Sequence, residues 1–261
     1  MFHTSTRHLL PLAAATLLAV GGAPAQAQQL IAPNVPVAGF DQRFYLAAFS
    51  QWWISIPAAT NPLLDLPGAN TALGDRGNHF FLPGSFDGTP VVRKVTVRPD
   101  QTLFLNLLVV TAWPDANETE ADLRALGSNV LGNVNSMSIT VDGAAALLPA
   151  GVATLEQLRQ SSPLFPLTVG PNNLGGWPVG LFPAIADGYL IAMEGLSLGN
   201  HQVRWTFNSS STGPFAGGPD LLQDITYNIT SVPEPAAWAS LSVGLLVIGA
   251  GALRRRRIDA H

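Results

Sequence analysis

The stretch VVRKVTVRPDQTLFLNLLVV, residues 91–110, predicts two successive β-strands. The first alternates, with Val91, Arg93, Val95 and Val97 on one face and Val92, Lys94, Thr96 and Arg98 on the other. A two-residue period is the pattern of a strand with one buried face. Residues 102–110 are almost continuously apolar, which indicates a buried strand. We expect the two strands to form a hairpin whose turn is residues 98–101.

The same patterns predict further strands at residues 79–83, 136–143, 189–193, 201–208 and 221–230, with residues 196–200 as a turn. A helix should begin after a cap at Asp41 and end by Ile56, because Pro57 disfavours helical geometry in the residue before it. Residues 115–126 predict a short surface helix capped by Asp115 or Asn117. We therefore expect a mainly β protein: an antiparallel β-sandwich, jelly-roll-like, with one or two short helices.

The composition excludes several classes of function. The chain has no cysteine, which excludes disulfides, thiol catalysis and cysteine-ligated metals. Residues 28–231 carry fifteen acidic and eight basic side chains, a net charge near −7. The basic residues do not form a stripe along the sequence, so nucleic acid is not an expected partner. The length of this segment suits one domain.

The two ends of the chain predict export. Arg7 and His8 precede a short apolar run at residues 9–20, and Ala25 and Ala27 fit the small-x-small rule for signal cleavage before residue 28. Residues 1–27 are therefore predicted to be a signal peptide read by the secretion machinery. Residues 236–253 carry no Asp, Glu, Lys or Arg, and eighteen helical residues are long enough to cross a thin bilayer.

Four arginines follow that apolar segment, Arg254, Arg255, Arg256 and Arg257. Lys and Arg flank the cytoplasmic end of a membrane span, so the body, residues 28–231, should lie outside the cytoplasm. The predicted transmembrane helix would anchor it on the periplasmic side of the inner membrane. A simple anchored periplasmic domain, with a stiff Pro-Glu-Pro linker and a tail that is never processed, is one alternative.

Residues 232–261 also resemble a known targeting signal. Val232, Pro233, Glu234 and Pro235, then one apolar helix and the arginine cluster, are similar to the PEP-CTERM sorting signal of exported proteins in Gram-negative bacteria that make extracellular polysaccharide. The resemblance implies recognition by an exosortase, a membrane enzyme that cuts near Pro-Glu-Pro. Glu234 would then be a recognition residue, and the body would pass to the cell surface or the extracellular matrix.

The body resembles a group of exported bacterial proteins with no known activity. The resemblance rests on QWWISIPAATNPLLDLPG, HFFLPGSF, VVRKVTVRPDQTLFLNLL and ADGYLIAMEGLSLGNHQVRW, in that order and spacing. It implies that the body is one domain. Some members of that group carry cysteines, and any bridge those form is absent here.

Candidate catalytic and metal sites are few. His79 and His201 lie on predicted strands and could bind a metal with Asp65 or Asp187, yet no recognised spacing supports this and we assign no metal. A triad of Ser85, His201 and Asp187 has no nucleophile-elbow motif to select it, and no catalytic residue is assigned.

Acidic side chains have ordinary structural interpretations. Glu118, Glu120 and Asp122 read as the solvated face of the short helix. Asp65, Asp75 and Asp87 lie in glycine-rich loops that could offer oxygens to Ca²⁺, but none follows a calcium-loop pattern, and bracing of turns is the favoured role. No cofactor is therefore assigned.

Tryptophans supply the remaining candidates. Trp52, Trp53, Trp113 and Trp177 could form a platform on which sugar rings stack. Core packing is the competing role, and it is expected for Trp205 and for one of Trp52 and Trp53. Trp177 itself falls in a glycine-rich segment that predicts a surface loop.

Two functional hypotheses follow. The first is a non-enzymatic exported surface or matrix protein that associates with exopolysaccharide or with itself. The second is a secreted hydrolase acting on glycans, which would need two carboxylates roughly 5–10 Å apart in a cleft.

Overall fold

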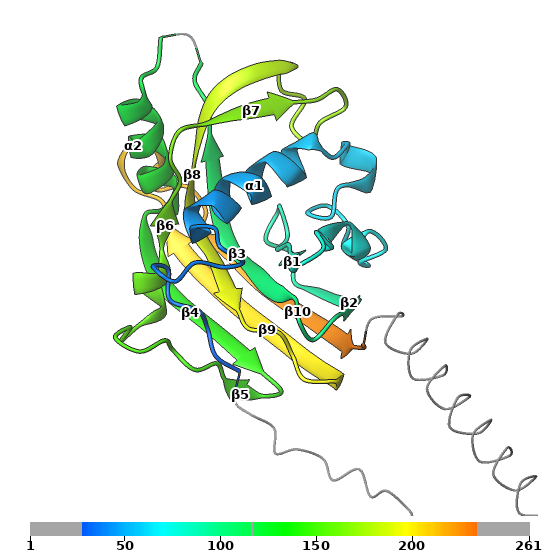
Figure 1. Cartoon of the computed structure of the whole chain (residues 1–261). Coiled ribbons are helices and arrows are strands. Elements are labelled where there is room, and N and C mark those ends of the chain that lie inside the picture. Colours follow the sequence, from blue (N-terminus) through cyan, green and yellow to red (C-terminus); the bar gives the residue numbers. More distant parts are fainter. Residues whose placement is uncertain (1–27, 116, 234–261) are drawn as a thin grey trace, which may run out of the picture.

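Two β-sheets pack face to face in the computed structural model, which describes residues 28–115 and 117–233 (Figure 1). The first sheet has the order β1 (His79–Leu82), β3 (Thr102–Ala112), β8 (Gly180–Met193) and β6 (Gln160–Ser161), with β7 (Phe165–Val169) also paired to β8. The second has the order β2 (Val91–Val97), β10 (Leu221–Ser231), β9 (Gly199–Ser210), β4 (Asn133–Val141) and β5 (Ala144–Ala145). The prediction of a mainly β protein with sheets in two layers and two helices is confirmed.

The sheets are mixed rather than wholly antiparallel. β1 runs parallel to β3, and β2 runs parallel to β10, whereas the other pairs are antiparallel. Each parallel pair joins strands from distant parts of the chain or across a long loop, as parallel pairing requires. The expectation of an antiparallel sandwich was wrong for these two pairs.

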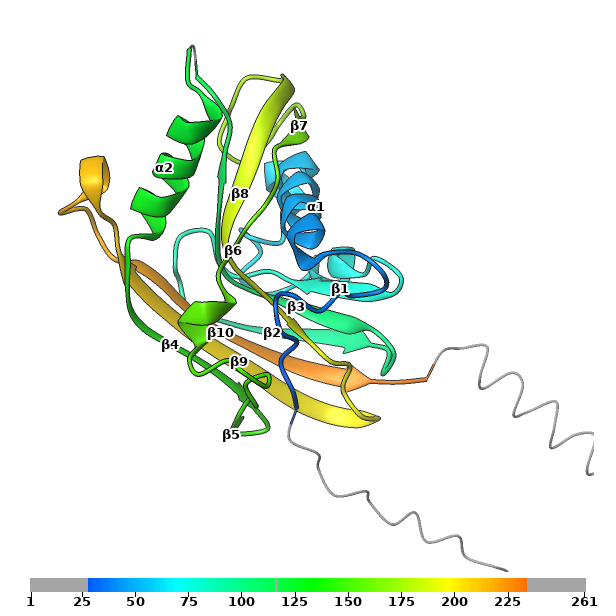
Figure 2. The same ribbon diagram turned by 60° about the vertical axis from the view of Figure 1, so that its left-hand side comes forward.

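Two helices flank the first sheet (Figure 2). Helix α1 (Gln42–Ser55) begins at its predicted cap, where the Asp41 side chain accepts from the Arg43 N–H at 2.8 Å, and Ile56 is extended before Pro57. Helix α2 (Glu120–Leu131) is capped by Thr119, not by Asp115 or Asn117, because Thr119 and Asp122 form a reciprocal capping box. Short 3₁₀ turns complete the set: η1 (Ala58–Thr60), η2 (Thr71–Gly74), η3 (Leu155–Leu158) and η4 (Gly213–Phe215).

The predicted hairpin over residues 98–101 is absent: β2 and β3 lie in different sheets. The reason is their burial. β2 buries every second residue, whereas residues 103–107 of β3 are all buried. On β3, Leu103 and Leu105 face the space between the sheets, and Phe104 faces α1 and its neighbours. β2 is buried on one face, whereas the first half of β3 is buried on both faces. The two strands therefore do not pair with each other, and the chain crosses from one sheet to the other between them.

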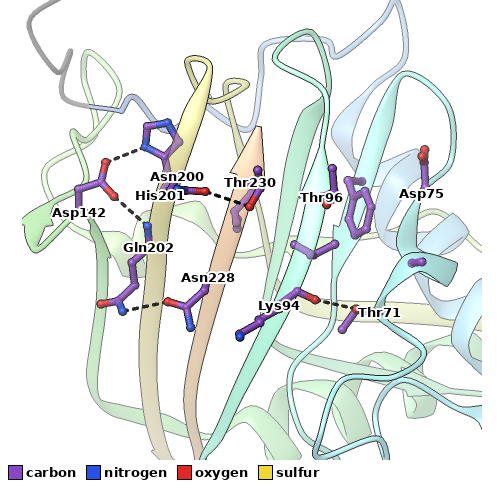
Figure 3. A pocket seen from close by; sticks show the side chains of 14 residues that line it. Thr71, Asp75, Lys94, Thr96, Asp142, Asn200, His201, Gln202, Asn228 and Thr230 are labelled. Carbon is purple, nitrogen blue, oxygen red and sulfur yellow. Dashed lines mark hydrogen bonds and ion pairs between the residues drawn. The ribbon is translucent and has the colours of Figure 1, made fainter. Parts of the chain in front are cut away.

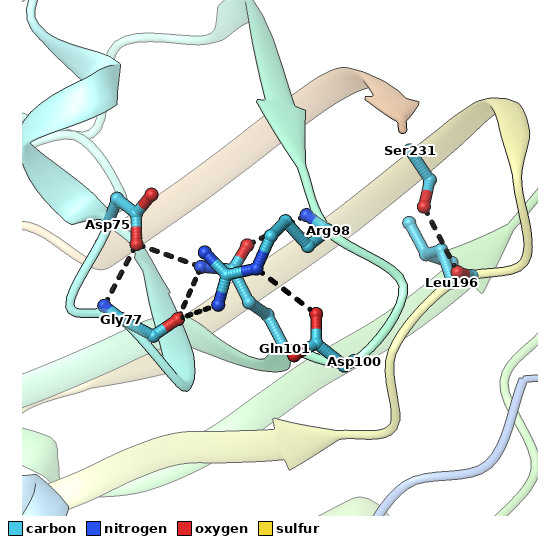
Figure 4. A network of polar contacts seen from close by, with 7 residues as sticks. All are labelled: Asp75, Gly77, Arg98, Asp100, Gln101, Leu196 and Ser231. Atoms are coloured by element: carbon cyan, nitrogen blue, oxygen red, sulfur yellow. Dashed lines mark hydrogen bonds and ion pairs between the residues drawn. The ribbon is translucent and has the colours of Figure 1, made fainter. Parts of the chain in front are cut away.

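The segment between β8 and β9 makes the same kind of crossing, again because residues 184–193 of β8 are all buried and β9 alternates. The two crossings touch, because a Cβ built on Gly195 would overlap the carbonyl oxygen of Pro99. Hydrogen bonds fix this end of the molecule (Figure 4). The buried Gln101 donates to Asp75 and Gly77, both at 2.8 Å, and Ser231 Oγ donates to Leu196 O at 3.1 Å.

Arg93 is fully buried between the sheets, on the inward face of β2 where the alternation placed it. Its Nε donates to Asp65 O at 3.0 Å, and its Nη1 donates to Pro83 O at 2.7 Å and Gly84 O at 3.0 Å. The Tyr227 hydroxyl on β10 lies 3.0 Å from the same Nη1. Arg93 therefore ties the long loop before β2 to the second sheet.

We predict that Arg93→Met lowers the free energy of unfolding by about 3 kcal/mol or more, because the carbonyl oxygens of that loop lose their buried donor. Arg43→Ala is the control: its ion pair with Asp41 is exposed to solvent, so its loss should change the free energy of unfolding far less than Arg93→Met does. Urea unfolding of the full chain in mild detergent, followed by tryptophan fluorescence, measures both. Equal effects of the two substitutions would contradict the prediction.

Candidate functional site

Polar side chains form two rows across the outer face of the second sheet (Figure 3). Strand register puts Lys94 of β2 beside Asn228 of β10, and Asn228 beside Gln202 of β9. The next row in the same register consists of Thr96, Thr230 and Asn200. Gln202 Nε2 donates to Asn228 Oδ1 at 3.2 Å, and Thr230 Oγ1 donates to Asn200 Oδ1 at 3.0 Å. These six residues are called the polar rows below.

A groove of about 880 Å³ covers the polar rows. On the β2 side its wall is η2 and the residues after it, and Thr71 Oγ1 fastens that wall by donating to Lys94 O at 3.0 Å. On the β9 side the groove reaches Asp142, in the turn between β4 and β5. The lining offers neutral amides and hydroxyls at its centre, and its two carboxylates, Asp75 and Asp142, lie at opposite sides (Figure 3).

Both carboxylates are engaged in hydrogen bonds. Asp75 accepts from Gln101 Nε2 at 2.8 Å and from the Gly77 N–H at 2.9 Å. Burial opposes ionisation of Asp142, but the hydrogen bonds from His201 and the Gln202 N–H outweigh it and lower the pKa of Asp142. A general acid for glycoside cleavage needs a raised pKa. Asp142 is therefore better suited to remain ionised than to act as a proton donor.

His201 closes the groove at the β9 side. Its Nδ1 lies 2.8 Å from Asp142 Oδ2, and its Nε2 lies 3.0 Å from Ser197 O and 3.2 Å from Ser197 Oγ. Ser, His and Asp in contact can form a nucleophile, a base and an orienting group. Here the carbonyl of Ser197 is the nearer partner of Nε2, so a proton on Nε2 is donated to that carbonyl. His201 thus links the β4–β5 turn to the β8–β9 crossing.

The metal set and the triad considered from the sequence are not assembled. His79 lies on β1 in the first sheet and His201 on β9 in the second. Asp187 lies on β8 in the first sheet and forms an ion pair with Arg159 at 2.8 Å, not with either histidine. Within residues 28–115 and 117–233, no group of three or more His, Asp and Glu side chains is placed to hold a metal ion.

Ser85 is buried and held by structural contacts. Its Oγ donates to Asp87 Oδ1 at 2.7 Å, and its backbone exchanges hydrogen bonds with the Gln223 side chain. The Ser85 hydroxyl and the Thr89 N–H lower the pKa of Asp87 to about 2. Asp87 therefore braces its turn, as predicted, and Asp65 and Asp75 do the same by accepting from Gly68 and Gly77.

The acidic helix face is solvated, as predicted: Glu118, Glu120 and Asp122 are all exposed. Glu120 pairs with Arg124 one turn later at 2.6 Å, and Asp122 belongs to the capping box. These acids stabilise the start of α2 and do not face a cleft with a second carboxylate pair.

The four tryptophans proposed as a sugar platform do not share an open surface. Trp52 and Trp53 are each 6% exposed and pack between α1 and the first sheet. Trp177 meets Trp53 and Trp113 edge to face, with ring centroids 5.9 and 5.0 Å apart. A sugar needs a free ring face, so burial favours the packing role for Trp52 and Trp53. Trp205 is also buried, as predicted.

The sorting and cleavage signals fall mostly outside the described residues. Ala25, Ala27, Glu234, Pro235 and the cluster Arg254–Arg257 lie there, as does the predicted transmembrane segment 236–253. Val232 is described, and its N–H donates to Val97 O at 3.0 Å. Across the described part of the chain, no helix has the length and apolar character to span a bilayer.

Comparison with known proteins adds little. No protein-family model matches the chain, and no curated protein matches it. The solved structure titled "Solution Structure of Amebosin" is similar over 59% of this chain and 100% of its own, at 12% identity and a TM-score of 0.20. A likeness at that score carries no argument, so the groove is interpreted from its own residues.

The sequence alone does not predict the polar rows. Lys94 and Thr96 were placed on one face of a strand, but the partners on β9 and β10 depend on strand order. Two signals were present: the outward residues of 200–208 and 224–230 are mostly neutral and polar, and Lys94 is the only lysine in the chain.

The half-buried His79 makes a test of the fold possible. The His79 ring packs edge to face on Tyr45 and Phe81, with centroids 4.9 Å away in each case. Burial, assisted by the charge of Arg76 and opposed by Asp75, lowers the pKa of His79 to about 4. The unfolded chain therefore binds more protons than the folded chain between about pH 6.5 and pH 4, and stability falls as the pH is lowered through that window.

We predict that His79 alone removes about 1 kcal/mol of stability between about pH 7.5 and pH 5, because the ring is only half-buried and water screens part of the effect. His79→Gln should lose that share of the pH dependence, although its stability at neutral pH is lower because ring contacts are gone. Urea unfolding of both proteins at the two pH values gives the difference. The same pH-dependent loss in both would show that His79 is not held neutral.

Proposed function

We propose that the chain is an exported, non-enzymatic protein that associates with polysaccharide through the groove over the polar rows. The observation that carries the proposal is the chemistry of that groove. Its centre consists of Asn, Gln and Thr side chains, which both donate and accept hydrogen bonds, as do the hydroxyls of a sugar. Its two carboxylates are held by other groups, which favours binding over hydrolysis.

The arrangement of the layers supports the same role. Within residues 28–115 and 117–233, no α-helix covers the outer face of the second sheet, so this face can receive an extended polymer along or across its strands. Adjacent rows are fixed by strand pairing, so the donors and acceptors are preorganised and lose little conformational freedom on binding. The alternative, a secreted glycan hydrolase, has less support because Asp142 and Asp75 sit at opposite sides with committed hydrogen bonds.

Export and sorting form the second part of the proposal. The leader at residues 1–27 directs secretion, the apolar segment 236–253 anchors the body at the periplasmic side of the inner membrane, and the PEP-CTERM-like signal passes it to an exosortase. The final location is then the cell surface or the extracellular matrix, where exopolysaccharide is available. The proposal draws here on the sequence of the two ends.

Binding is tested with the extracellular polysaccharide purified from cultures of the producing strain. We predict that the full chain in mild detergent co-sediments with it and that Asn228→Ala with Gln202→Ala weakens binding about thirtyfold, since two neutral hydrogen bonds are lost and each is worth about 1 kcal/mol. Ser138→Ala, on the same sheet face but outside the groove, is the control and should bind as the parent does. No co-sedimentation of the parent chain would overturn the binding proposal.

Sorting is tested by the mass of the mature protein. We predict that protein from the producing strain begins at Gln28 and ends near Pro235, and that replacing Arg254–Arg257 with Gln leaves uncut chain in the inner membrane. A mature mass that still includes His261 would mean that the tail is a permanent anchor and that the sorting proposal fails.

A further inference from the structure

Lys94 stands out on the outer sheet face because its charge has no protein partner among the described residues. The other cation in the neighbouring rows, Arg204, is paired with Asp224 at 3.0 Å on the adjacent strand. Asp142 is engaged by His201. The Lys94 ammonium group has no hydrogen bond or ion pair to the described part of the protein, although it lies in the groove beside Asn228.

The position of this charge is held firmly. The backbone of Lys94 is paired to β10 on one side, and its carbonyl accepts from Thr71 Oγ1 on the other, at 3.0 Å. Its neighbour Arg93 is fixed inside the protein by four hydrogen bonds. The stem of Lys94 therefore leaves a rigid point on the groove floor, and only the flexible side chain has to adjust to a ligand.

Lys94 is the only Lys or Arg among the described residues that line the groove, so a negative charge is favoured beside it. Asp75 and Asp142 lie at its two sides and would repel an anionic group there (Figure 3). Lys94 lies between them, next to the amides of Asn228 and Gln202, which can bind hydroxyls. A ligand that matches this pattern carries hydroxyls along its length and a single anionic group at the position of the lysine.

We propose that the groove recognises an acidic polysaccharide in which neutral sugar units separate the carboxylates, and that Lys94 binds one of these carboxylates. This inference rests on the proposed polysaccharide association and names the class of polymer. Lys94 supplies the charge, and the polar rows supply hydrogen bonds to the neutral units. The ion pair would be exposed to solvent, so its contribution is modest and falls as salt is raised.

The test compares two polymers with the same backbone: polygalacturonate whose remaining free carboxylates are separated by methyl-esterified units, and the fully methyl-esterified polymer. We expect the full chain in detergent to bind the acidic polymer about fivefold more tightly at low salt, as an exposed ion pair allows. Lys94→Gln should bind both polymers equally, and Lys94→Arg should keep the preference because the charge is kept. Arg204→Gln makes the same change of charge on the same face and should keep the preference as well.

A second readout uses the fact that Lys94 is the only lysine in the chain. Acetylation with an N-hydroxysuccinimide ester modifies Lys94 and the chain's amino terminus, and mass spectrometry of peptides separates the two. The acidic polymer should slow acetylation of Lys94 but not of the amino terminus. The fully methyl-esterified polymer at the same concentration should protect it less.

The possible results distinguish the inference about Lys94 and acidic sugars from the more general proposal of polysaccharide association. Equal binding of both polymers by the parent chain, still weakened by Asn228→Ala, would overturn the role of Lys94 and leave polysaccharide association standing. Binding of the producing strain's polysaccharide but of neither test polymer would also overturn the acidic-sugar inference. No binding of any of the three polymers would overturn both.

Discussion

Burial of β3 and β8 on both faces determines the order of layers on which the rest of the structure depends. An apolar strand pair needs a cover on each side, and α1 supplies one while the second sheet supplies the other. The second sheet then has one covered face, and its outer face is left for polar residues. The groove lies on that outer face because the second sheet needs to be buried on its inner face only.

Consecutive cations on β2 show how the two faces differ. Arg93 points inward, where its planar group of donors satisfies several carbonyl oxygens and the Tyr227 hydroxyl at once. Burial raises the pKa of Tyr227 to about 12, against the opposing effect of Arg93, so its hydroxyl stays protonated beside the guanidinium. Lys94 points outward as a single mobile charge. Each residue type suits the face on which it lies: the buried guanidinium is held by several acceptors, and the exposed ammonium group is free to move.

Local patterns predicted the elements well and their partners poorly. The alternation at residues 91–97, the helix after Asp41 and its end before Pro57 follow from short-range rules, and the structure confirms all three. The hairpin at residues 98–101 was wrong because loop length says nothing about which layer a strand joins. The different burial of residues 91–97 and 102–110 was already visible, and it distinguishes a crossing from a hairpin. The polar rows needed strand register between residues over a hundred positions apart, which no local pattern contains.

The groove and the proposed anchor are close to each other along β10. Thr230 and Asn228 belong to the polar rows, and the last paired residue, Ser231, is followed by Val232 bound to Val97 O. Four residues separate Ser231 from the apolar segment that begins at residue 236, and these five residue-to-residue steps reach at most ~18 Å. On the proposed topology, the Thr230 end of the groove therefore lies near the membrane while the tail is attached.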